Sequence, residues 1–119
     1  MALYESGENY LETILVLKER TGKVRSVDVA AETGFSKPSV SRAIGILKKE
    51  GLIEVDESGW IELTKEGESR AAAVLGRHIV IADYLSGVLG VDEKTAQEDA
   101  CRIEHIISDK TFKKMKESL

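Results

Sequence analysis

The chain has 119 residues, 42% of them hydrophobic, and a net charge of −4. This is enough for one compact core or two small lobes that share one. Its amino terminus lacks the basic start and apolar run of a signal peptide, and Arg77, His78 and Asp83 interrupt the apolar stretch 71–85. We therefore expect a soluble protein with no membrane partner. A single cysteine cannot close an internal disulfide, which indicates the reducing cytoplasm.

The charge is unevenly distributed along the chain. Residues 1–50 carry 8 Lys/Arg against 7 Asp/Glu, whereas residues 51–119 carry 9 against 14, so the halves have net charges of +1 and −5. A basic patch for nucleic-acid phosphates would therefore lie in the first half, and the acidic second half would favour a cation.

Residues 6–50 contain the signals of three helices. The apolar stripe of the first helix runs from residue 6 to 20, with Ser6 as its N-cap. A short helix follows, with Ser26 as N-cap and Gly34 as C-cap, and a longer one runs from Lys37 to about Glu50. Two short helices, a glycine turn and a longer helix are typical of a helix-turn-helix.

The longer helix has one apolar face and one small, polar or cationic face. Its serine hydroxyls and amino-terminal amides can bind phosphate, Arg42 can reach a base edge or a phosphate, and Gly45 removes bulk where backbones approach. A solvated surface would also explain this face, although a glycine in mid-helix costs about 1 kcal/mol relative to alanine. We expect the DNA-binding residues to be Ser36, Lys37, Pro38, Ser39, Ser41, Arg42 and Lys49.

A β-hairpin follows the longer helix. Residues 52–56 and 60–64 have short strand patterns, and Gly59 supplies the unusual backbone angle of the turn between them. Thr64 caps a new helix. The sequence thus predicts a mainly α protein in which a winged helix-turn-helix spans residues 1–64 and a helical domain spans residues 65–119. Trp60 is predicted to be a packing residue.

The second half contains a group of metal-binding residue types. If residues 92–105 form a helix, Cys101, Glu104 and His105 are spaced i, i+3 and i+4 on one face and offer a thiolate, a carboxylate and an imidazole. A lone cysteine in the core of an amphipathic helix would also fit. His78, on the helix 65–87, is a structural residue or a further ligand, and Asn9 and Glu12 are solvated surface or oxygen donors.

These pieces together resemble the diphtheria toxin repressor family of iron- and manganese-dependent transcription regulators. The resemblance covers nearly the whole chain and rests on Glu8–Glu12, Ser36–Ser41, Leu63–Gly67, Arg77–His78 and Asp99–His105. It implies a homodimer that binds an inverted repeat in double-stranded DNA, with Fe(II) or Mn(II) as corepressor and no enzymatic activity. The implied metal ligands are Asn9, Glu12, His78, Cys101, Glu104 and His105.

The chain departs from the family pattern at several positions. Asn9 stands where iron-type members have methionine and manganese-type members have aspartate. Cys101 matches the iron type, whereas Glu12 and the length, which leaves no C-terminal SH3-like domain, match the shorter manganese type. Ala82 and Gln97 replace two ligands of the ancillary iron-type site, so the resemblance does not carry that site over to this chain.

Two other classes of function remain open from the residues alone. One is a winged-helix regulator that senses oxidant or a small molecule through Cys101 without a metal, and the other is a zinc metalloenzyme. The apolar surface of the last three helices, including Val80, Ile81 and Ile106, exceeds what one chain can bury, so we expect a two-fold dimer. A metal in contact with Asn9 and Glu12 in one lobe and the remaining ligands in the other would fix the two lobes together and favour the DNA-binding arrangement.

Overall fold

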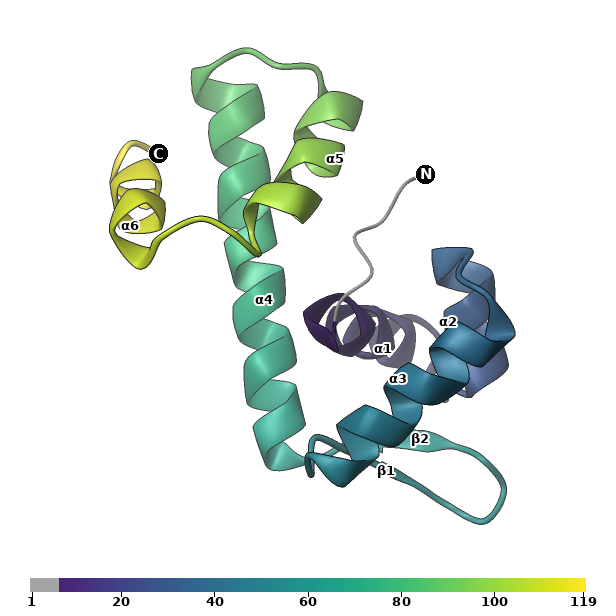
Figure 1. Ribbon diagram of the computed structural model, residues 1–119. Coiled ribbons are helices and arrows are strands. Elements are labelled where there is room, and N and C mark those ends of the chain that lie inside the picture. The colour runs from purple at the N-terminus through teal and green to yellow at the C-terminus, as the bar shows by residue number, and fades with distance from the viewer. Residues whose placement is uncertain (1–6) are drawn as a thin grey trace. The chain divides into compact units, whose positions relative to one another are not determined.

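The computed structural model describes residues 7–119 and is mainly helical (Figure 1). Ser6, the expected first N-cap, lies outside the described residues. The elements in chain order are α1 (Gly7–Thr21), α2 (Ser26–Thr33), α3 (Lys37–Lys49), β1 (Ile53–Val55), β2 (Ile61–Leu63), α4 (Lys65–Asp83), the π-helical turn η1 (Tyr84–Val88), α5 (Glu93–Ile103) and α6 (Asp109–Glu117).

The chain forms two compact units, divided within α4. The amino-terminal unit contains the described residues up to Ala72, and the carboxyl-terminal unit contains Ala73–Leu119. The proposed division at residues 64/65 remains a prediction.

The amino-terminal unit is a winged helix-turn-helix, as predicted. Helix α1 packs against α2, α3 and β2, and α3 packs against β1 (Figure 1). The antiparallel strands pair Ile53 with Leu63 and Val55 with Ile61. One apolar core joins all of these elements, with Leu11, Ile14, Val24, Val29, Val40, Leu47, Leu52, Ile53 and Ile61 among its buried side chains.

Local capping fixes where the helices of this unit begin and end. The hydroxyl of Ser36 accepts a hydrogen bond from the backbone N–H of Ser39, at 3.2 Å, with Pro38 in the first turn of α3. Gly34 ends α2 at a φ of +78°, as expected. The prediction for Ser26 was wrong: Arg25 is the N-cap of α2, and its N–H donates to Asp28, so Ser26 lies inside the helix.

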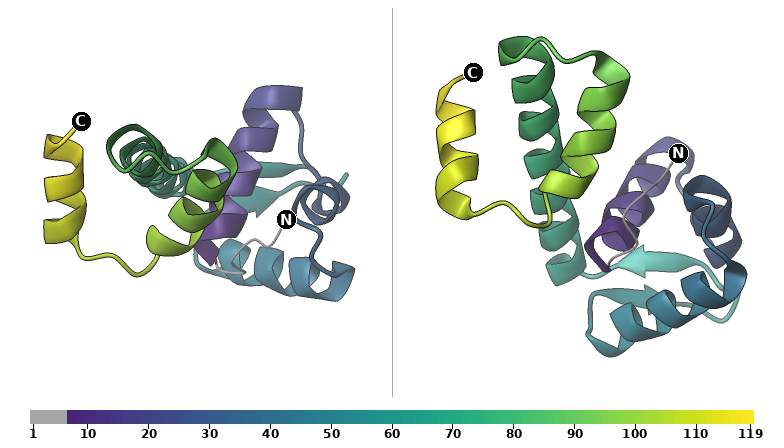
Figure 2. Two further views of the ribbon diagram at one scale, coloured as in Figure 1. Left: turned by 90° about the horizontal axis from the view of Figure 1, so that it is seen from above. Right: turned by 45° about the horizontal axis from the view of Figure 1, so that its top comes forward.

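The carboxyl-terminal unit is helical throughout. Helices α5 and α6 lie on opposite sides of the second half of α4 (Figure 2). Its core is small, with Ile81, Ala82, Leu85, Ala96 and Ala100 buried and Phe112 and Met115 of α6 packed against them. Asp92 caps α5 and Ser108 caps α6 through their side chains.

The segment Lys65–Val88 is long and apolar enough to cross a membrane if only its length and composition are considered. Core helices of soluble proteins meet the same criterion. Ala71, Val74, Ile81 and Leu85 of this segment are buried within the protein. The segment thus contributes Ala71 to the core of the amino-terminal unit and Ile81 and Leu85 to that of the carboxyl-terminal unit.

Candidate metal centre and DNA-facing helix

His78 of α4 and Glu104, at the end of α5, meet in the carboxyl-terminal unit. Nδ1 of His78 lies 2.9 Å from Oε2 of Glu104, although 26 residues separate them. The Glu104 carboxylate is completely buried, and the His78 side chain is 14% exposed. The fold thus joins two of the residues that the sequence singled out as metal ligands.

Helix α5 ends before His105, although the i, i+3, i+4 spacing predicted that the helix would include it. Its last residue is Ile103, Glu104 is the C-cap, and His105 lies in the turn that follows. The turn is anchored by Arg77, whose Nη1 donates to the backbone carbonyl of Glu104 at 3.2 Å. Glu104 keeps helical backbone angles at the cap. Its side chain therefore leaves the backbone in the direction that a further residue of α5 would have.

His105 also contacts Glu104. Its Nε2 lies 3.3 Å from Oε1 of Glu104, close enough for an ion pair. The angles do not make this contact a hydrogen bond, and Oε1 has no hydrogen-bond partner among the described residues. The carboxylate therefore lies between two imidazoles, with one buried oxygen atom unsatisfied.

Gln97 is a neighbour of His78 that the sequence analysis did not identify as a partner. Its Oε1 lies 2.7 Å from Nε2 of His78, and its side-chain amide donates to Oε1 of Glu93 at 3.1 Å. Gln97 lies one turn before Cys101 on α5, and this spacing, with its position at a replaced ancillary ligand, was the signal in the sequence for a role beside the site.

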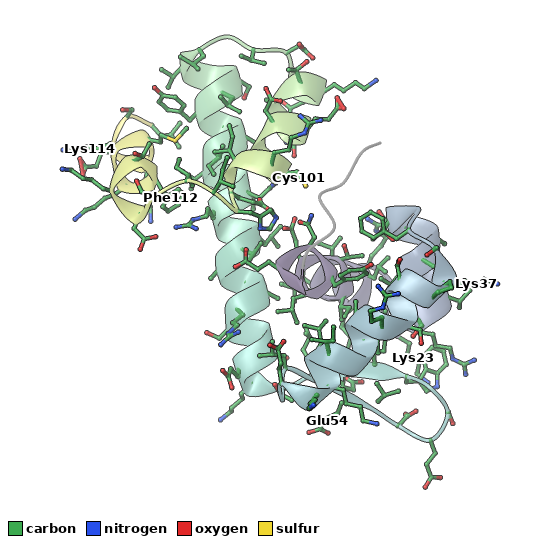
Figure 3. The ribbon with its side chains drawn as sticks, viewed as in Figure 1. Lys23, Lys37, Glu54, Cys101, Phe112 and Lys114 are labelled. Atoms are coloured by element: carbon green, nitrogen blue, oxygen red, sulfur yellow. The ribbon has the colours of Figure 1, made fainter. Side chains whose placement is uncertain are left out.

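Metal binding by any of the six predicted ligands stays a prediction, and the other three lie elsewhere in the two units. Cys101 is buried on α5 (Figure 3). Asn9 and Glu12 lie one turn apart on α1 in the amino-terminal unit, where Asn9 is buried and Glu12 half-buried.

The residues of the carboxyl-terminal unit fit a divalent cation. A buried carboxylate is costly unless it is paired and hydrogen-bonded, yet Oε1 of Glu104 lacks a hydrogen bond among the described residues. Imidazole and carboxylate are common ligands of first-row divalent metals, and a thiolate favours iron, cobalt and zinc over manganese. A cation would satisfy this oxygen and offset the cost of burying the charge.

The polar face of α3 is open to solvent, as predicted. Lys37, Pro38, Ser41, Arg42 and Lys49 are exposed, and Ser39 is half-buried (Figure 3 labels Lys37). The hydroxyl of Ser36 already caps the helix and also bonds to that of Ser39. A Cβ atom at Gly45 would meet nothing within 4 Å, so this position leaves an open gap.

Trp60 has a more specific setting than general packing. The guanidinium carbon of Arg25 lies 4.0 Å from the centre of its ring, and Nζ of Lys23 lies 5.0 Å from it. These distances are typical of cation–π contacts. Trp60 therefore joins the hairpin to the segment before α2, a long-range pairing that no local pattern in the sequence indicated.

Comparison with known proteins covers nearly the whole chain. Residues 2–59 match the family model described as the iron dependent repressor N-terminal DNA binding domain, and residues 64–119 match that of the iron dependent repressor metal binding and dimerisation domain.

Individual relatives are similar to this chain over most of its length. It is 32% identical to the diphtheria toxin repressor of Corynebacterium glutamicum over 98% of its own length and 51% of the relative's. It is 38% identical to the transcriptional regulator MntR of Escherichia coli, over 88% of this chain and 67% of that one.

A solved structure of the manganese regulator SloR superposes with a TM-score of 0.86 at 28% identity, over 99% of this chain and 54% of that one. The chain thus spans about half the length of the diphtheria toxin repressor and of SloR. Both family models and the identity to MntR agree with the resemblance inferred from the sequence motifs. The chain belongs to the iron-dependent repressor family, which includes the diphtheria toxin repressor.

Proposed function

We propose that this chain is a cytoplasmic, metal-dependent transcriptional repressor that binds double-stranded DNA as a homodimer, with Fe(II) or Mn(II) as corepressor. The observation that carries the proposal is the buried Glu104 carboxylate in contact with two imidazoles. The chain also matches the iron dependent repressor models and is similar to the structure of the manganese regulator SloR. Family membership supports a regulator over a zinc enzyme or a metal-free sensor that acts through Cys101.

His78, Glu104 and His105 would bind the cation, together with Cys101. By resemblance, Asn9 and Glu12 of α1 complete the set of ligands. When bound, the cation supplies positive charge and fixed coordination geometry. Ligands drawn from both units would then favour one arrangement of the two, and an arrangement that binds DNA would be stabilised by linkage.

Helix α3 would enter the major groove with its open polar face. Arg42 and Lys49 supply positive charge, and Ser41 supplies a hydroxyl group near the amino end of the helix. A single recognition helix contacts few base pairs, so two copies on an inverted repeat would provide the specificity.

Apolar residues left exposed in the carboxyl-terminal unit support the dimer. Ile79, Val88, Leu89 and Ile106 are between 48% and 78% exposed. Ile81 must be removed from the expected dimer surface, because it is fully buried in the core of its own unit. Light scattering at micromolar concentration with Mn(II) should give twice the monomer mass, and a monomer would contradict this part of the proposal.

The central test is a titration of metal against DNA affinity. Genomic fragments bound by the protein in Mn(II) would supply the operator, and fluorescence anisotropy would measure its affinity with chelator, with Mn(II) and, without oxygen, with Fe(II). We expect either metal to raise the affinity, and Glu104→Gln and His78→Ala to abolish that rise. Glu98→Gln, a matched carboxylate on α5, should respond as wild type.

Equal DNA affinity in chelator and in metal would overturn the proposal. If a Cys101→Ser variant then lost a response to oxidant, the metal-free sensor would be supported instead. The choice of metal has its own test: Cys101→Asp should keep a metal response and shift it from Fe(II) towards Mn(II), because a carboxylate is a harder ligand than a thiolate.

A further inference from the structure

The ring of His78 is held at both of its nitrogen atoms. Nδ1 lies 2.9 Å from Oε2 of Glu104, and Nε2 lies 2.7 Å from Oε1 of Gln97. The amide nitrogen of Gln97 in turn donates to Oε1 of Glu93, at 3.1 Å. All four residues belong to the carboxyl-terminal unit, so these contacts do not depend on the placement of the other unit.

The chemistry of these groups fixes the direction of the hydrogen bonds. An ionised carboxylate only accepts hydrogen bonds, so the amide NH₂ of Gln97 must face Glu93 and its carbonyl oxygen must face His78. A carbonyl oxygen also only accepts, so Nε2 of His78 must carry a proton. By the same rule Nδ1 carries a proton towards the Glu104 carboxylate while no cation is bound, and that proton would leave when a cation binds at Nδ1.

We propose that Gln97 is a positioning residue for metal binding, which holds His78 through Nε2–H so that Nδ1 is the nitrogen offered to the cation beside Glu104. Glu93 acts one step further out by orienting the Gln97 amide. This inference rests on the proposed function and deepens it. By resemblance alone Gln97 is only a missing ancillary ligand, whereas the geometry gives it a role in support of a different ligand.

The expected size of the effect follows from how such support works. A partner on the second nitrogen of a ligating histidine fixes the tautomer and ring orientation, and its loss typically lowers metal affinity about 10- to 100-fold. Gln97 is exposed on α5, and leucine is a good helix former of similar length. Gln97→Leu should therefore lower Zn(II) affinity about tenfold and leave the thermal unfolding midpoint unchanged.

Zn(II) alone is the probe, with affinity measured by competition against a chromophoric chelator. The chain has two histidines, so ¹⁵N-labelled imidazole gives two sets of ring signals. We expect one ring, lost in His78→Ala, to be metal-bound at Nδ1 and protonated at Nε2. In the double variant Glu93→Gln/Gln97→Glu, the amide would donate from residue 93 to residue 97, and the carboxylate at residue 97 would still accept from Nε2 of His78. Its Zn(II) affinity should therefore exceed that of Gln97→Leu and match wild type. Glu98→Gln on the same helix is the control.

Three results would overturn the proposal: Zn(II) bound through Nε2 of His78, wild-type Zn(II) affinity in Gln97→Leu, or failure of the reversed pair to restore affinity. If the wild-type protein binds no Zn(II), Mn(II) or Fe(II), the proposed function fails and this inference fails with it. If metal raises DNA affinity in the wild-type protein while Gln97→Leu keeps full Zn(II) affinity, only this inference fails.

Discussion

The two units of the chain differ in the size of their cores and in what they bury. The amino-terminal unit buries a large apolar core and leaves Lys37, Arg42 and Lys49 exposed on α3. The carboxyl-terminal unit has a smaller core, buries the Glu104 carboxylate and leaves side chains such as Ile79 and Ile106 exposed. The first unit therefore presents positive charge on one exposed helix face, whereas the second buries its carboxylate and leaves apolar side chains exposed that fit the proposed dimer.

The largest expected effect tests how tightly the amino-terminal unit is packed. A Cβ atom at Gly67 would lie 1.9 Å from the carbonyl oxygen of Leu52, which also accepts a hydrogen bond from the N–H of Thr64. Gly67→Ala should therefore lower the free energy of unfolding by about 3 kcal/mol, since neither backbone can move freely. Chemical denaturation measures it, and Gly76→Ala on the same helix, where nothing lies within 4 Å, is the control.

The control variant Gly76→Ala should change the free energy of unfolding in the opposite direction to Gly67→Ala. Gly76→Ala should be neutral or slightly stabilising, by up to about 1 kcal/mol, because alanine is the better helix former. If Gly67→Ala and Gly76→Ala had the same unfolding free energy, the close approach of α4 to Leu52 would not exist in solution.

The second prediction tests the exposed charge of the amino-terminal unit. Arg42→Ala should weaken operator binding by about 1 to 3 kcal/mol and leave unfolding unchanged, because the side chain is exposed on α3. Arg70→Ala removes the same charge from α4 and should have a smaller effect on DNA affinity. Unchanged affinity in Arg42→Ala would mean that this face of α3 does not contact the DNA.

Gly45 should separate stability from function on the same face. Nothing lies within 4 Å of a Cβ atom at this position, so Gly45→Ala should raise the unfolding free energy by up to about 1 kcal/mol. The added methyl group would stand where the DNA approaches, so operator affinity should fall. A variant that is more stable and also binds DNA normally would show that the groove does not require the glycine.

The smallest effect concerns a helix cap in the carboxyl-terminal unit. The backbone N–H of Thr95 donates to Asp92 at 3.0 Å and, with the Thr95 hydroxyl, lowers the pKa of this carboxyl below its ordinary value of 3.8. A lowered pKa contributes stability that is present above the ordinary value and is lost as pH falls through the lowered one. Asp92→Asn keeps a capping group but should flatten the acid side of a stability–pH curve below the ordinary pKa of 3.8.

Asp92→Ala should lose the cap at every pH, so it separates capping from titration. Unfolding midpoints measured across the acid range would distinguish the two variants. An Asp92→Asn curve that still follows wild type through this range would assign the acid dependence to other carboxyls.

The sequence by itself determined the features that depend on neighbouring residues. Ser36 and Pro38 begin α3, Gly34 ends α2 and Gly59 turns the hairpin, because the group that caps each end or allows each backbone angle lies within a few residues. The types of residue suited to a metal site, and the open polar face of α3, could be read from the sequence for the same reason.

Only the tertiary structure decided the contacts between distant residues. It brought Nδ1 of His78 to Glu104, gave Gln97 its place beside Nε2, and put Trp60 under Arg25. It also ended α5 at Ile103, where no glycine or proline marks a stop and Arg77 anchors the turn. These outcomes depend on which helices pack together and how closely, and such packing is set by the shapes of both cores rather than by any local stretch of the chain.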